Sequence, residues 1–230
     1  MKIHSLIHLP FEDTGCIRHW AQKKGYSFSE TRLYDGQSLP ILSDFDLLIV
    51  MGGTMNIYEE DKYPWLAEEK SFIMSAIDSE KKVIGICLGA QIIASVLGAK
   101  VTKNRKPEVG WFGVEMCCGK EDNALCSLLP ERFLAFHWHG DTFEIPCGAE
   151  HLFKSPACDN QAFLYDERIL GLQFHPEVTG VNVRNLVENC FYDIKEGFDS
   201  IQTAPEILGI DKTGPLNEVM YLILEYFEKL

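Results

Sequence analysis

A cysteine between two glycines is the strongest chemical signal in the chain, where residues 85–91 read GICLGAQ. The segment follows an apolar run typical of a buried strand and opens a second run typical of a helix. A nucleophile on such a strand-to-helix turn needs small residues two positions before and after it, because strand and helix approach closely there. The helix N-terminus also favours a thiolate. The pattern predicts Cys87 as a nucleophile, with a structural cysteine in a glycine-containing turn as the alternative.

A histidine and a glutamate follow the apolar run 169–172, where residues 173–177 read QFHPE. A thiol nucleophile is usually paired with an imidazole that takes its proton and later returns it to the leaving amine. A carboxylate on the other ring nitrogen fixes the tautomer of that imidazole. The intervening proline keeps the segment extended, so alternate side chains point the same way. His-Pro-Glu alone is a weak signal, but with the cysteine turn it predicts a triad of Cys87, His175 and Glu177.

Two glycines, Gly52 and Gly53, come directly after the buried run that ends at Val50. In an open parallel sheet, ligands bind outside the carboxyl ends of the strands. Paired glycines there allow a backbone N–H to turn toward a developing oxyanion. We predict an oxyanion hole formed by the N–H groups of Gly53 and Leu88. Without the other two motifs, an ordinary glycine-rich turn would be the preferred interpretation.

Two further histidines, His137 and His139, alternate along an expected strand and so face the same side. Such a pair can begin a metal site, but Asp141 is the only nearby candidate for a third ligand. We therefore predict that no metal is bound, that His139 lines the substrate pocket and that His137 is a satisfied core residue. The acidic run 59–61 is expected to be a solvated loop, with attraction of an amine as the alternative.

Apolar runs that alternate with helical patterns through the first hundred residues indicate the elements that position these groups. The expected strands are residues 2–9, 26–33, 45–51 and 83–86, and the expected helices are residues 14–24, 65–79 and 88–97. This alternation predicts an α/β fold with a mostly parallel open sheet and helices on both faces. From 101 to 174, frequent glycines and prolines predict short strands and turns instead.

The end of the chain is expected to be helical. One apolar helical face is formed by Val183, Leu186, Val187, Cys190, Phe191 and Ile194. A second helix is expected to start at Pro215, which is a favoured first-turn residue. Leu222, Leu224 and Tyr226 lie off its main apolar stripe, which would allow contact with a partner subunit, but packing on the same domain is the preferred interpretation.

The bulk properties restrict the classes of partner. The chain has 230 residues, of which 46% are hydrophobic and 24% charged, and it shows no internal repeat or long linker. We predict one domain at residues 1–195, with a C-terminal helical extension at residues 196–230 packed on it. The net charge of −13 would repel a phosphate backbone or an anionic membrane surface. Nucleic acid and membranes are therefore not expected as partners.

The eight cysteines lack the paired spacing of a zinc site. The apolar N-terminal run is too short for a signal peptide, and no stretch approaches the roughly 20 apolar residues of a membrane span. We therefore expect a cytoplasmic protein in a reducing setting, in which most cysteines act as small buried apolar residues.

Taken together and in this order, the cysteine turn, the glycine pair and the His-Pro-Glu segment resemble the class I (triad-type) glutamine amidotransferases, with the closest similarity to the stand-alone GMP-synthase-like branch. The similarity spans roughly residues 2–185. Further matching segments are Tyr63-Pro64-Trp65-Leu66, Glu108-Val109-Gly110-Trp111 and Phe136-His137-Trp138-His139-Gly140-Asp141. The resemblance implies a flavodoxin-like fold and no cofactor.

The same resemblance implies a thioester mechanism, in which Cys87 attacks the side-chain amide carbon of glutamine, ammonia leaves and water releases glutamate. It also implies that Gly52, Gln91 and the His139-Gly140 segment help to bind the amino acid. One departure is Thr54, where the family often has proline after the two glycines. The geometry of the oxyanion loop is therefore expected to differ slightly from the usual form.

The identity of the substrate stays open at this point. The chain has no glycine-rich loop for ATP phosphates and no second domain large enough to be a synthetase. It is expected either to pass ammonia to a separate synthetase subunit or to act alone as a γ-glutamyl hydrolase or peptidase. A non-catalytic protein that binds a γ-glutamyl metabolite or another protein is less favoured, because Cys87, His175 and Glu177 are all intact. A general cysteine peptidase is less favoured because of the His-Pro-Glu arrangement and Gln91. Homo-oligomers are compatible with the sequence.

Overall fold

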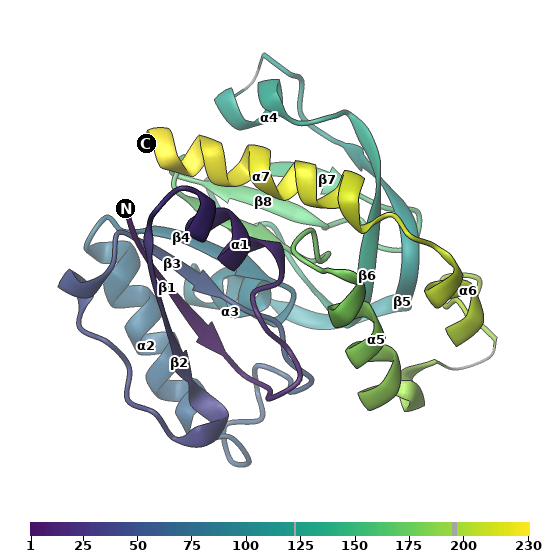
Figure 1. Ribbon diagram of the computed structural model, residues 1–230, viewed down its shortest axis with the longest axis horizontal. Helices are drawn as coiled ribbons and strands as arrows, with labels where there is room; N and C mark the ends of the chain where they lie inside the picture. The colour runs from purple at the N-terminus through teal and green to yellow at the C-terminus, as the bar shows by residue number, and fades with distance from the viewer. Residues whose placement is uncertain (122, 195–196) are drawn as a thin grey trace.

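One nine-stranded sheet runs through the molecule in the computed structural model, which describes residues 1–121, 123–194 and 197–230 (Figure 1). Along the sheet the strands follow the order β2-β1-β3-β4-β9-β8-β7-β5-β6. Its first half is parallel and consists of β2 (Ser27–Arg32), β1 (Lys2–Ile7), β3 (Leu47–Val50), β4 (Lys82–Ile86) and β9 (Ile169–Leu172). These are the strands that the apolar runs predicted, with ends that differ by no more than two residues.

The second half of the sheet is antiparallel. It consists of β8 (Ala162–Tyr165), β7 (Glu150–Lys154), β5 (Val101–Met116) and β6 (Arg132–Phe143). The expectation of short strands is wrong for β5 and β6, which have 16 and 12 residues. Pro107 does not end β5, because it lies where the β5–β6 register shifts between Lys103 and Glu108. At this irregularity a residue without a backbone N–H costs no hydrogen bond between the strands.

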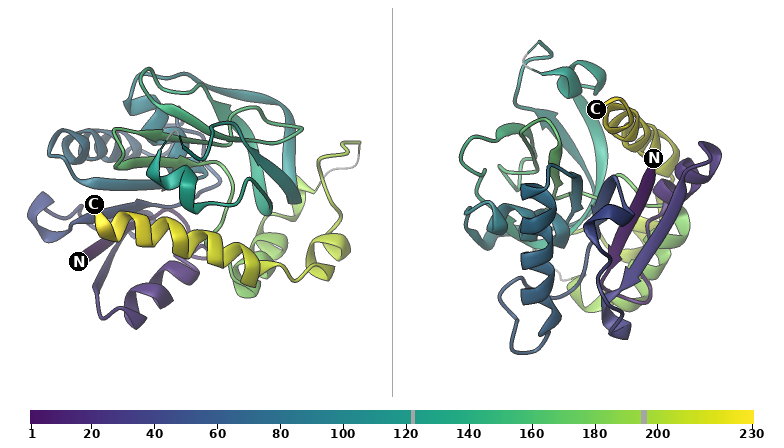
Figure 2. Two further views of the ribbon diagram at one scale, coloured as in Figure 1. Left: turned by 90° about the horizontal axis from the view of Figure 1, so that it is seen from above. Right: turned by 90° about the vertical axis from the view of Figure 1, so that its left-hand side faces the viewer.

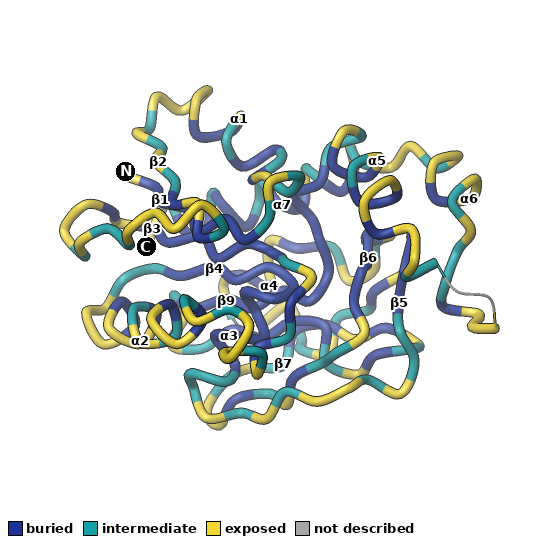
Figure 3. The backbone as a smooth tube through the Cα atoms, turned by 90° about the horizontal axis from the view of Figure 1, so that it is seen from below, coloured by how far each residue is buried: buried dark blue, intermediate teal, exposed yellow. Residues whose placement is uncertain are grey.

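Helices cover both faces of the parallel half, as predicted (Figure 2). Their bounds are α1 (Cys16–Lys23), α2 (Trp65–Asp78), α3 (Leu88–Val96) and α7 (Thr213–Lys229). Alternate β3 residues point to opposite faces, so Leu47 packs in a core with α1 and α7 and Leu48 in a core with α2 and α3. The central strands β3, β4 and β9 are buried, whereas the outer surfaces of the helices are exposed (Figure 3).

The C-terminal region contains one more helix than expected. The remaining helices are α4 (Ala124–Leu128), α5 (Gly180–Asn189) and α6 (Ala204–Gly209), with short 3-10 turns at Leu33–Asp35, Leu42–Asp44 and Phe191–Asp193. The apolar face predicted to reach Ile194 is therefore divided between α5 and the last of these turns. The unexpected α6 begins with a capping box. The Thr203 side chain accepts a hydrogen bond from the Glu206 backbone, and the Glu206 side chain accepts one from the Thr203 backbone.

Helix α7 packs against α1, α4 and β6. Leu224 and Tyr226 are buried and Leu222 is half-buried, so these residues off the main stripe pack within the chain itself. The Tyr226 hydroxyl donates to the Glu167 backbone carbonyl at 2.9 Å. The boundary that we predicted at residue 195 lies outside the described residues and stays a prediction.

Two cysteines depart from the reduced state that the sequence led us to expect. Cys118, which follows β5, and Cys126, in α4, form a disulfide. Cys16, Cys87, Cys158 and Cys190 are buried free thiols, whereas Cys117 and Cys147 are exposed. Among the described helices, none has the length and apolar character needed to cross a membrane.

Candidate active site

Cys87 lies on a tight turn between β4 and α3. Its φ of 52° is in the left-handed region, which non-glycine residues rarely adopt. A Cβ atom added at Gly85 would lie 2.6 Å from the Gly89 backbone, and one at Gly89 would lie 2.1 Å from the Val50 carbonyl oxygen. Both glycines are therefore required by the close approach of α3 to β3 and β4. The turn holds the thiol at the carboxyl edge of the sheet and the N-terminus of a helix.

His175 and Glu177 lie at the same edge, after β9. The His175 Nδ1 and Glu177 Oε1 atoms are 2.9 Å apart, and both side chains are buried. The His175 backbone N–H donates to the Phe136 carbonyl of β6 at 2.8 Å, which fixes the segment. Burial disfavours the imidazolium, but the neighbouring Glu177 and Cys87 outweigh burial and raise the pKa of His175 well above its ordinary value.

The glycine pair passes close to the nucleophile. A Cβ atom at Gly52 would lie 3.1 Å from the His175 Cε1 atom and 3.7 Å from the Cys87 Cβ atom. A Cβ atom at Gly53 would lie 2.8 Å from the Leu88 Cδ2 atom. The structure thus brings Gly52 close to Cys87 and Gly53 close to Leu88, and the oxyanion hole itself stays a prediction.

A buried histidine that the sequence analysis did not single out anchors this loop. His8, just after β1, contacts the Gly52 carbonyl through Nδ1 at 2.8 Å and Glu69 of α2 through Nε2, also at 2.8 Å. Its ring stacks on Trp65, with centroids 5.4 Å apart. Burial lowers the pKa of His8, but the neighbouring Glu69 raises it by a larger amount, so the net shift is upward. Through these two contacts His8 connects the glycine loop to α2.

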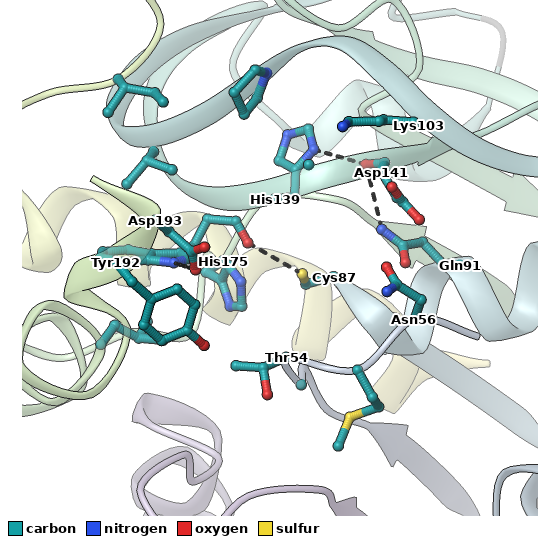
Figure 4. Close-up of a pocket in the computed structure, with 18 of the residues that line it drawn as sticks. Thr54, Asn56, Cys87, Gln91, Lys103, His139, Asp141, His175, Tyr192 and Asp193 are labelled. Carbon is teal, nitrogen blue, oxygen red and sulfur yellow. Dashed lines mark hydrogen bonds between the residues drawn. The ribbon is translucent and has the colours of Figure 1, made fainter. Parts of the chain in front are cut away.

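A cavity of about 350 Å³ opens in front of Cys87 (Figure 4). Of the residues predicted from the resemblance to bind substrate, Gln91, His139 and Gly140 line it, as do Gly53 and His175. The Gln91 amide donates to the Gln173 side chain at 3.1 Å, which orients it at the cavity wall. A volume of this size lies within the range of about 300–1,000 Å³ that accommodates small molecules.

Several cavity residues were not anticipated. They are Glu12, Thr54, Asn56, Lys103, Asp141, Tyr192, Asp193 and Phe198, among others. Glu12 has a pKa that is raised by burial and by the charge of Glu177, against the opposing influence of His175. A signal for Glu12 was available, because it follows the carboxyl end of β1. Asp193 accepts from the Trp138 indole at 3.0 Å, and no local pattern links these two positions.

The histidine pair of β6 has a third neighbour that the sequence analysis missed. Glu108 of β5 pairs with His139 across the β5–β6 ladder, and its carboxylate is 3.1 Å from His139 Nε2. Asp141, the ligand candidate considered from sequence, contacts His139 through its backbone carbonyl at 2.9 Å. The prediction that His137 is fully satisfied is wrong, because its Nδ1 has no hydrogen-bond partner among the described residues.

The acidic run 59–61 is part of the loop that follows the glycine pair. The Glu59 carboxylate accepts from the Asn56 backbone N–H at 2.7 Å, and Glu60 pairs with Lys70 of α2 at 2.7 Å. These contacts favour a structural role in a solvent-facing loop.

Comparisons with known proteins identify the family of the chain. The family model described as glutamine amidotransferase class-I matches residues 18–194. The chain is 32% identical over 193 residues to the glutamine amidotransferase-like protein YfeJ of Salmonella typhimurium, covering 82% of this chain and 81% of that protein. It is 35% identical over 159 residues to one of the subunits of the glutamine-hydrolysing GMP synthase of Sulfurisphaera tokodaii, covering 65% and 79% of the two chains.

Solved structures are similar over nearly the whole chain. The crystal structure of a glutamine amidotransferase from Thermotoga maritima superposes with a TM-score of 0.88 at 32% identity, covering 98% of this chain and 97% of that one. A glutamine amidotransferase from Methylobacillus flagellatus gives a TM-score of 0.90 at 26% identity, with coverage of 99% and 94%.

Proposed function

The chain belongs to the class I glutamine amidotransferase family, and we propose that it hydrolyses the side-chain amide of glutamine through a thioester on Cys87. The observation that carries the proposal is the arrangement at one edge of the sheet. A cysteine held at positive φ faces a cavity that His175 also lines, and His175 is hydrogen-bonded to Glu177. This arrangement supplies a nucleophile, a base and an orienting carboxylate.

The proposed reaction begins when the Cys87 thiol gives its proton to His175 and the thiolate attacks the amide carbon. The N–H groups of Gly53 and Leu88 stabilise the oxyanion. The C–N bond then breaks, and His175 returns the proton to the nitrogen, which leaves as ammonia. A water molecule attacks the thioester with His175 as base, and the C–S bond breaks to release glutamate and the thiol. Throughout, Glu177 holds the imidazole in the required tautomer.

The fate of the ammonia is a separate part of the proposal. A relative of this chain is named as one of the subunits of a glutamine-hydrolysing GMP synthase. The partner that we propose for this chain is likewise a separate synthetase subunit, which receives the ammonia. We propose a cytoplasmic setting, which is supported by the six free cysteines and opposed by the Cys118–Cys126 disulfide.

The alternative substrate class is a γ-glutamyl peptide or amide. It is favoured by the extent of the cavity, because Tyr192, Asp193 and Phe198 line it in addition to the predicted glutamine-binding residues. A leaving group larger than ammonia would contact these residues. A self-sufficient peptidase would then need no partner subunit.

The test combines a nucleophile variant with a substrate panel. Cys87→Ala is expected to lose about 10⁴-fold or more in rate, whereas Cys158→Ala, which also removes a buried thiol, is expected to change it little. Released glutamate, ammonia and amine are measured with glutamine, glutathione and other γ-glutamyl amides. Preference for glutamine by more than about tenfold, or ~1.4 kcal/mol, supports the ammonia donor. Full activity of Cys87→Ala would refute the mechanism, and folded, reduced protein with no turnover would support a binding protein instead.

A further inference from the structure

Three buried side chains with metal-ligand atoms converge between β5 and β6, behind the wall of the cavity. They are Glu108, His137 and His139, with one ligand atom from each lying within 4.8 Å of the other two. The Glu108 Oε2 atom is 3.1 Å from His139 Nε2 and 3.8 Å from His137 Nδ1. All three side chains are at most 1% exposed. Alternation along β6 places both imidazoles on one face, and the β5–β6 register places Glu108 opposite His139.

The hydrogen bonds of the two rings define which nitrogen atoms are free to act as ligands. His139 Nδ1 is 2.9 Å from the Asp141 carbonyl oxygen, and His137 Nε2 is 3.4 Å from the Phe112 carbonyl oxygen. A carbonyl only accepts, so these nitrogens carry the protons in the neutral rings. The lone pairs of His139 Nε2 and His137 Nδ1 then face the Glu108 carboxylate, which is itself an acceptor.

Glu108 Oε2 accepts from the Gln161 amide, but no proton lies between it and the two imidazole lone pairs, so the buried carboxylate still needs a cation beside it. One way to meet this need is a second proton on His139, which would make an ion pair with Glu108. That proton would still leave His137 Nδ1 without a partner among the described residues. A metal ion satisfies all three atoms at once, and its histidine ligands would donate their other N–H to carbonyls, as metal-bound histidines usually do.

We propose that Glu108, His137 and His139 bind a divalent transition-metal cation, with Zn²⁺ as the best match to two imidazoles and one carboxylate. Bonds of about 2.1 Å in tetrahedral geometry separate neighbouring ligand atoms by about 3.4 Å. The distances of 3.1 Å and 3.8 Å lie on either side of this value. The Glu108 carboxylate is already oriented by the Ser155 hydroxyl at 2.7 Å and the Gln161 amide at 2.5 Å, as a ligating carboxylate commonly is.

The position of the site relates it to the cavity. His139 lines the cavity (Figure 4), whereas Glu108 and His137 are not among the residues that line it. Trp138 lies between the two histidines, and its carbonyl oxygen is 3.7 Å from the Cys87 sulfur. A bound cation would therefore hold in place the strand that faces the nucleophile. The proposal does not depend on the substrate, because metal binding is measured without turnover.

The experiment is a titration of chelator-treated, full-length protein with Zn²⁺ in competition with a chromophoric chelator. We expect one Zn²⁺ per chain, bound with micromolar or tighter affinity, and binding at least about 100-fold weaker in Glu108→Gln and in His137→Gln. Cys117→Ser is the matched control, because Cys117 and His151 form an exposed contact at 3.6 Å that could also attract zinc. Its affinity is expected to equal that of the wild type.

Two further readouts separate the site from its alternatives. Co²⁺ is expected to give a visible spectrum of nitrogen and oxygen ligands without a thiolate charge-transfer band, and Zn²⁺ is expected to raise Tm in the wild type but not in folded Glu108→Gln. If one variant does not fold, the other provides the comparison, and the Co²⁺ spectrum of the wild type stands without either. The proposal is overturned by the absence of stoichiometric Zn²⁺, by a thiolate band, or by unchanged affinity in the folded variants. The first result would assign the cluster to a protonated His139–Glu108 ion pair.

Discussion

At the scale of single residues, the site depends on how the environment of His175 controls its proton. The imidazolium is stabilised by Glu177 and by the Cys87 thiolate, which together overcome the cost of burial. The attacking form is the thiolate with its proton held by His175, so activity is expected to fall at high pH as the imidazolium loses that proton. Each carboxylate near the ring therefore affects the pH range of activity.

Glu177→Gln is expected to lower the rate by about 10-fold to 10⁴-fold and to move the alkaline limb of the pH–rate profile to lower pH. The sign follows because Glu177 raises the pKa of His175, so its removal lets the imidazolium lose its proton at lower pH. The measurement is kcat/KM against pH for the wild type, this variant and the exposed control Glu188→Gln. An alkaline limb that does not move would show that Glu177 does not stabilise the imidazolium of His175.

At the scale of elements, the position of Cys87 depends on how closely α3 approaches β3 and β4. The apolar runs on both sides of the turn determine that a strand and a helix form, and the glycines determine how near they come. Glycine costs stability within a helix, so its presence at Gly89 in the first turn of α3 reflects this close approach.

Gly89→Ala is expected to destabilise the protein by about 1–3 kcal/mol or more and to reduce activity sharply. Its Cβ atom would overlap the backbone of Val50, so α3 would have to move away and carry the Cys87 turn with it. Gly113→Ala is the control, because a Cβ there meets nothing within 4 Å. Unfolding midpoints in urea measure the difference. Equal stability of the two variants would contradict the importance of this close approach.

At the scale of the whole molecule, the last helix completes the core on one face of the parallel sheet. The buried residues of α7 include Leu216, Met220 and Phe227, and they join the same apolar cluster as Ile3 and Leu47. Residues between α5 and α7, including Asp193 and Ile201, also line the cavity. The C-terminal region thus contributes both to the core and to the site.

Phe227→Ala is expected to lower the free energy of unfolding by about 3–5 kcal/mol, because the Phe227 side chain is fully buried. The exposed Phe191 serves as the control, and Phe191→Ala is expected to change stability by less than about 0.5 kcal/mol. Thermal unfolding followed by near-UV and far-UV circular dichroism measures both. A separate early transition confined to helical signal would indicate that residues 196–230 form an independent extension.

The sequence alone was sufficient to propose those parts of the candidate site whose residues lie close together in the chain. The cysteine turn and the His-Pro-Glu segment each combine a fixed spacing of residues along the chain with a local backbone conformation. The strands of the parallel half are continuous apolar runs, so each could be identified on its own. In an open parallel sheet the carboxyl ends of neighbouring strands meet at one edge. Three separate motifs could therefore be assigned to one site before their distances were known.

The tertiary structure decided what depends on pairing between distant segments. Glu108 meets His139 only because β5 and β6 are long antiparallel strands in one register, with Pro107 at the register shift, whereas glycines and prolines had suggested short strands. The contact of Trp138 with Asp193 likewise joins segments whose approach has no local signal. Register and packing depend on the free energy of the whole core. No single segment of the sequence determines them, so the residues that complete the cavity and the proposed metal site emerge only in the folded chain.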